Sequence, residues 1–126
     1  MVQSISISSL QEWKKYTNEQ EIIFLFIHAD WCQPCQWIKN TLFEYMEKKE
    51  VANSVFLKIE YDTWKNQPEW VSQFPDKVSL PAFYIFYRNE FFKPIIPVDM
   101  RFIEPFVNDK LGEIEREKNI EWNENF

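Results

Sequence analysis

The chain has 126 residues and two cysteines, Cys32 and Cys35, which are separated by Gln33 and Pro34. A cysteine thiolate is a nucleophile, and two cysteines three positions apart on one helical turn can be oxidised to a disulfide. Exchange between a dithiol and a disulfide passes through a mixed disulfide, which needs one exposed sulfur and one shielded sulfur. The spacing therefore suits thiol–disulfide exchange.

The segments on either side of this pair explain how it would be positioned. Residues 21–28 form an apolar run without polar alternation, which predicts a fully buried strand. Apolar side chains at three- and four-residue spacing predict a helix from the motif to about residue 49. Cys32 then lies at the helix N-terminus, where free N–H groups and the helix dipole stabilise a thiolate, and Pro34 is tolerated in the first turn. We expect Cys32 to attack as the nucleophile and Cys35 to resolve the mixed disulfide, although Asp30 opposes the thiolate by like-charge repulsion.

Two other interpretations of the cysteine pair are open. The pair could be half of a zinc site, but zinc requires four ligands and the one other strong candidate is His28. The cysteines could also be inert core residues. Trp31, Pro34 and the buried strand before the motif argue against the inert interpretation, and we predict no metal site.

The rest of the chain alternates between strand and helix signals. Strands are predicted at residues 3–7, 55–61, 82–87 and 91–96, and helices after Ser8 or Ser9, near Pro68 and from about Glu104, with Pro105 in the first turn. Asn89 suits a turn with positive φ, and Pro94 and Pro97 would mark the last strand as an edge strand. This order predicts an α/β fold, with a mixed sheet and helices on both faces.

Composition excludes several classes of function. Fourteen basic against twenty acidic residues give a net charge of −6, which argues against a general nucleic-acid binder. Gly112 is the single glycine, so the chain has neither a phosphate-binding P-loop nor a dinucleotide fingerprint. No serine is flanked by glycines, as a hydrolase nucleophile elbow requires.

The length and the cysteine count also bear on organisation and location. We expect one domain over residues 1–118, followed by a frayed acidic tail over residues 119–126. No export signal and no membrane-spanning run are recognisable, so we expect a cytoplasmic protein that does not associate with membranes. A close cysteine pair in a reducing compartment is more often catalytic than structural.

The motif Trp31-Cys32-Gln33-Pro34-Cys35 and Ser79-Leu80-Pro81 before the strand at 82–87 resemble the thioredoxin family over residues 7–111. The resemblance implies a thioredoxin fold in which Pro81 is cis, beside the cysteines, and Leu80 and Pro81 contact a substrate peptide. It implies protein disulfides as substrates and a flavin-dependent reductase as partner, with no cofactor beyond the Cys32–Cys35 couple. A glutaredoxin is disfavoured, because this chain has Ser79-Leu80 where that family has Thr-Val and no glycine pair after the proline.

Two positions depart from the family pattern. Gln33 stands where the family usually has glycine, and Phe26 stands where it usually has a buried aspartate that assists proton transfer at the second cysteine. Lys58 matches a lysine that the family places under the active site. Phe26 and the aromatic excess motivate an alternative function, in which the chain is a thioredoxin-fold binding or adaptor module with little redox turnover.

Overall fold

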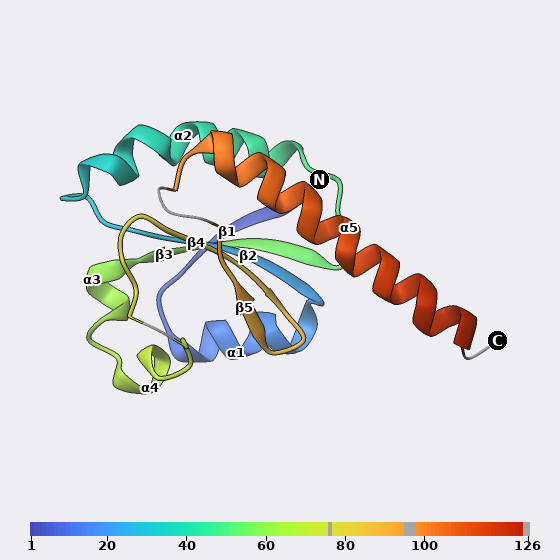
Figure 1. Cartoon of the computed structure of the whole chain (residues 1–126). Coiled ribbons are helices and arrows are strands. Elements are labelled where there is room, and N and C mark those ends of the chain that lie inside the picture. Colours follow the sequence, from blue (N-terminus) through green and yellow to red (C-terminus); the bar gives the residue numbers. More distant parts are fainter. Residues whose placement is uncertain (76, 95–97, 125–126) are drawn as a thin grey trace. The chain divides into compact units, whose positions relative to one another are not determined.

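The structure is a computed structural model, shown in Figure 1, that describes residues 1–75, 77–94 and 98–124. Contacts between Cα atoms divide the chain into two compact units, residues 1–93 and 94–126. The cysteine motif belongs to the first unit.

The first unit contains a five-stranded sheet with the order β1-β3-β2-β4-β5. Its strands are β1 (Gln3–Ile7), β2 (Ile22–His28), β3 (Ser54–Glu60), β4 (Ala82–Tyr87) and β5 (Glu90–Phe92). β3 pairs in parallel with both β1 and β2, whereas β4 is antiparallel to β2 and to β5. The sheet is therefore mixed, as the sequence predicted.

Helices cover both faces of this sheet. α1 (Leu10–Glu19) and α2 (Gln33–Lys48) lie on opposite sides of it (Figure 1), and the short helices α3 (Tyr61–Trp64) and α4 (Pro68–Val71) follow β3. Ser9 is the N-cap of α1, where its hydroxyl accepts the Glu12 N–H at 3.2 Å. A cap of this kind satisfies one of the free N–H groups at a helix start.

The central strand β2 is buried along its whole length. Successive strand residues point to opposite faces, so its side chains divide into two sets. Ile23, Leu25 and Ile27 join the core that includes Trp13 of α1. Phe24, Phe26 and His28 point to the other face. A strand buried on both sides carries no polar alternation, and the uninterrupted apolar run of β2 has this cause.

The hairpin at the sheet edge differs in part from the prediction. Arg88 and Asn89 have positive φ angles of 51° and 63°, which confirms the turn expected at Asn89. β5 is one of the two edge strands, and it ends at Phe92, short of the bounds of 91–96 that the sequence predicted. Pro94 lies beyond it, and residues 95–97, including Pro97, lie outside the described part of the chain.

The second unit contains α5 (Met100–Glu124). The predicted start near Glu104 was wrong, because the helix begins at Met100, directly after Asp99. The Asp99 carbonyl accepts the Ile103 N–H at 2.9 Å and its carboxylate accepts the Arg101 N–H at 2.8 Å. Pro105 is consequently inside the helix rather than in its first turn.

The described helix also continues beyond Lys118 to Glu124, so residues 119–124 are helical rather than frayed. The assignment of residues 1–118 to one domain stays a prediction. Across residues 1–75, 77–94 and 98–124, no helix combines the length and the apolar character needed to cross a membrane.

Candidate active site

The two cysteines lie where β2 passes into α2. Cys32 is the N-cap residue of α2, and Pro34 is in the first turn, as the sequence predicted. The Cys35 N–H donates to Cys32 Sγ at 3.2 Å, and the Gln36 N–H donates to the Cys32 carbonyl at 3.2 Å. The sulfur of Cys32 thus takes the place of the side-chain oxygen that usually caps a helix. Negative charge on this sulfur is stabilised by the N–H group and by the helix dipole.

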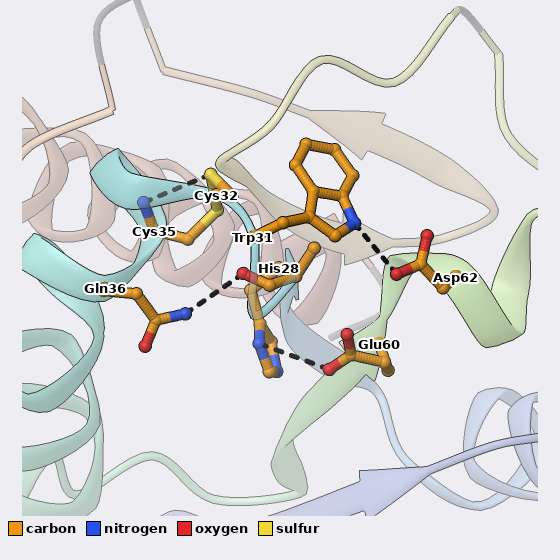
Figure 2. The surroundings of a disulfide bond; sticks show 8 residues. His28, Trp31, Cys32, Cys35, Gln36, Glu60 and Asp62 are labelled. Carbon is orange, nitrogen blue, oxygen red and sulfur yellow. Dashed lines mark hydrogen bonds and ion pairs between the residues drawn. A yellow bond between two sulfur atoms is a disulfide. The ribbon is translucent and has the colours of Figure 1, made fainter.

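Cys32 and Cys35 form a disulfide with a Cα–Cα distance of 5.3 Å. Figure 2 shows this bond at the start of α2. Cys32 keeps 6% of its surface exposed, while Cys35 is fully buried. The two sulfurs are therefore unequal, and the one on Cys32 is more accessible to a reactant from solvent.

The backbone before Cys32 is held by two hydrogen bonds to one carbonyl. The Ala29 carbonyl accepts the Cys32 N–H at 3.1 Å and the Gln36 side-chain amide at 3.0 Å. These bonds join the end of β2 to the first turn of α2. Gln36 was not among the predicted site residues, because nothing in its position suggests which carbonyl its amide would reach.

Trp31 is anchored beside the disulfide although its side chain is 64% exposed. Its indole N–H donates to Asp62 Oδ2 at 2.9 Å, and its ring meets Tyr61 edge to face with centroids 6.0 Å apart. Lys65, whose Nζ lies 3.1 Å from Asp62 Oδ1, and then Trp31 lower the pKa of the Asp62 carboxyl. These contacts fix the indole against α3 (Figure 2).

Asp62 was missed in the sequence, because its place beside Trp31 depends on how two strands pair. β2 and β3 are parallel neighbours with His28 opposite Glu60, so both strands end at the same edge of the sheet. Residues that directly follow the two strands must then come close together. This relation would have placed Asp62 beside Trp31.

His28 and Glu60 form a second polar pair at this edge, with Nδ1 of His28 3.7 Å from Oε2 of Glu60 (Figure 2). Burial, followed by the positive charge of Lys39, lowers the pKa of His28. Burial, followed by the negative charge of Asp30, raises the pKa of Glu60. Both shifts favour the uncharged forms.

Phe26 fills the position at which the family usually has a carboxylate. It is fully buried, stacks on His28 with ring centroids 5.2 Å apart, and meets Phe43 of α2 at 5.9 Å. Lys58 is the register partner of Phe26 on β3, and its Nζ lies 4.8 Å from the centroid of the Phe43 ring. The ammonium of Lys58 therefore meets an aromatic face.

The predicted substrate-contacting segment reaches the same edge of the sheet. The peptide bond between Leu80 and Pro81 is cis, which is the isomer that the resemblance implied. Pro81 directly precedes β4, whose first residue Ala82 is the register partner of Ile27. This segment and the cysteine motif thus both lie at the end of β2. Among the described residues, no cluster of three or more His, Cys, Asp or Glu side chains is arranged to hold a metal ion.

Comparisons with known proteins agree with this geometry. A family model described as thioredoxin-like matches residues 11–87. A thioredoxin from Coprinus comatus is 28% identical over 106 residues, which cover 84% of this chain and 96% of the relative. The fold is similar to Schistosoma mansoni thioredoxin (TM-score 0.68, 16% identity, 85% of this chain and 94% of that one). It is also similar to Plasmodium falciparum thioredoxin (TM-score 0.66, 17% identity, 87% and 98%).

The chain has the thioredoxin fold and belongs to the thioredoxin-like family. The family and the Cys32–Cys35 disulfide place it in the general class of thiol–disulfide oxidoreductases.

Proposed function

We propose that this protein reduces disulfide bonds in other proteins and that Cys32 and Cys35 carry the two steps. The observation that carries the proposal is the position of Cys32, whose sulfur caps α2 and accepts the Cys35 N–H. A sulfur in this place is stabilised as a thiolate and is also the more exposed of the two. Cys35 lies behind it, within disulfide distance.

The reaction begins with the reduced protein. The Cys32 thiolate attacks one sulfur of the substrate disulfide, which forms a mixed disulfide and releases the other substrate sulfur as a thiolate. The Cys35 thiolate then attacks Cys32 Sγ, which forms the Cys32–Cys35 bond and releases the second substrate thiolate. The substrate gains two electrons and the protein loses two, and protons from solvent neutralise the released thiolates.

Several residues would support these steps. Trp31 is fixed by Asp62 beside the reacting sulfur, and Gln33 and Pro34 form the exposed first turn of α2. Leu80 and Pro81 would offer backbone groups to the substrate peptide. Regeneration of the dithiol requires an external electron donor, for which a flavin-dependent reductase is the expected partner, and the cytoplasm is the expected compartment. No further cofactor is needed.

One assay separates this function from that of an adaptor module. We expect the protein to accelerate the reduction of insulin disulfides by dithiothreitol, and a Cys32→Ser variant to lose the acceleration. The adaptor alternative is motivated by Phe26, which is packed between His28 and Phe43 and offers no proton acceptor. A rate no greater than that of dithiothreitol alone would favour the adaptor and reject the reductase.

A further inference from the structure

Trp37 is a large apolar side chain that the reaction described above does not use. It lies in the second turn of α2 and is 73% exposed. Within the described part of the chain, no ring contact or hydrogen bond holds its indole. Trp31 differs in this respect, because Asp62 and Tyr61 anchor it.

The helical register brings Trp37 close to the cysteine motif. Side chains three and four positions apart are neighbours on a helix surface, so Trp37 lies over Pro34 and Gln33. All three are exposed, whereas Cys35 and Ile38 face the core. An exposed stripe therefore runs from the start of α2, beside Cys32, to the indole of Trp37.

A substrate joined to Cys32 in the mixed disulfide can reach this stripe. A disulfide holds the two Cα atoms about 4.4–6.8 Å apart. Trp37 lies five positions after Cys32, which is about 7.5 Å along a helix. An extended chain advances about 3.3 Å per residue, so a substrate residue two or three positions from its cysteine can reach the indole.

The charges near Trp37 indicate which side chain it would contact. Its neighbours on the helix surface are Gln33, Pro34, Asn40 and Thr41, and none of them is charged. Electrostatic attraction therefore has little part in recognition here, and burial of apolar surface is the available driving force. Tryptophan is also among the residues that most often dominate binding at protein interfaces.

We propose that Trp37 is a specificity-determining residue, which packs against an apolar side chain two or three positions from the reacting cysteine of a protein substrate. This inference rests on the proposed function. It assigns Trp37 no part in electron transfer, so the reactivity of Cys32 toward a small disulfide is independent of it.

The test uses the full chain and three disulfide-linked peptides. The peptides differ only at the position three residues from the reacting cysteine, where they carry leucine, glycine or arginine. The small probe is bis(2-hydroxyethyl) disulfide. Trp37→Ala is compared with the wild type and with Thr41→Ala, a matched control one turn further along the exposed face. We expect Trp37→Ala to lower kcat/KM for the leucine peptide about tenfold, which corresponds to about 1.4 kcal/mol.

The rates of Trp37→Ala for the glycine peptide and for the small disulfide should stay within about twofold of the wild-type rates. Thr41→Ala should reduce all four substrates at the wild-type rates. An equal loss on all substrates, or no loss on the leucine peptide, would overturn the inference while the reductase function stands. A loss confined to the arginine peptide would show that the recognised side chain is cationic, and would overturn the apolar assignment. A wild-type protein that reduces none of the four substrates would reject the reductase function, and the inference would fall with it.

Discussion

Nδ1 of His28 and Oε2 of Glu60 face each other at 3.7 Å, on paired positions of β2 and β3. The distance is too long for a hydrogen bond, and Nδ1 has no hydrogen-bond partner within the described residues. Four charged residues act on this pair. Asp30 precedes α2, Lys39 lies on α2, Lys58 lies on β3, and Asp62 follows β3. The pair is thus a titratable element next to the disulfide.

His28 should make the stability of the protein depend on pH. Its folded-state pKa is lowered from 6.5, mainly by burial, so the unfolded chain binds the proton more readily. The contribution of His28 to stability is fully present above pH 6.5 and is lost as the pH falls through the folded-state pKa. Urea midpoints at pH 5 and pH 7.5 should therefore differ less for His28→Asn than for the wild type.

Glu60 acts in the opposite direction, because its folded-state pKa is raised above 4.5. Its favourable contribution is present below pH 4.5 and is lost as the pH rises. Glu60→Gln serves as the control for the His28 experiment, since it should change the pH dependence with the opposite sign. Identical pH dependence in the wild type and His28→Asn would show that His28 is not responsible.

Phe26 should limit the second chemical step. Phenylalanine cannot accept a proton, and full burial disfavours the Cys35 thiolate. We expect the wild-type rate to be low at neutral pH and to increase as the pH rises. Positioned acid–base groups contribute about a hundredfold or more, so Phe26→Asp should increase turnover near neutral pH.

Phe26→Asn is the matched control for this substitution, because it has a similar size and creates the same gap but cannot take up a proton. Removal of a buried phenylalanine side chain costs about 3–5 kcal/mol of stability, so both variants are first checked for folding. If folded Phe26→Asp and Phe26→Asn had the same rate and pH profile as the wild type, another group, such as Lys58 or Glu60, would already handle the proton.

Cys32 should be the reactive thiol of the reduced protein at neutral pH. Its sulfur accepts an N–H at the start of α2, whereas Cys35 is fully buried. Brief treatment with iodoacetamide followed by peptide mass mapping should find the label on Cys32. Preferential labelling of Cys35 would reverse the assignment of the two roles.

Reduction of the disulfide should leave the fold intact. The bond joins residues only three positions apart, so it closes a short loop and restricts the unfolded chain little. The sheet and its apolar core do not depend on it. Far-ultraviolet circular dichroism should be the same with and without dithiothreitol, and a large loss of signal on reduction would contradict this expectation.

The sequence predicted most elements of the first unit because their signals are local. β2 follows from an uninterrupted apolar run, and the start of α1 follows from Ser9. The start of α5 was misjudged because Pro105 is typical of a first helical turn, whereas Asp99 supplies the actual cap. The helix-start signal of Pro105 was outweighed by the cap at Asp99, six residues earlier.

The surroundings of the cysteines were harder to predict. Cys32, Cys35 and Pro34 could be placed from the motif alone, since a strand leads directly into a helix there. The contacts of Trp31 with Asp62 and of His28 with Glu60 join residues 31 or 32 positions apart. They depend on the register between β2 and β3, which a single sequence does not specify.

The most direct test of the proposed mechanism is to trap its covalent intermediate. Reduced Cys35→Ser protein is mixed with a disulfide-containing protein such as insulin, and the products are analysed by mass spectrometry without reductant. Because Cys35 is absent, the mixed disulfide between Cys32 and the substrate should accumulate, and Cys32→Ser should form none. Equal trapping by both variants, or trapping by Cys32→Ser alone, would contradict the assignment of Cys32 as the attacking thiol.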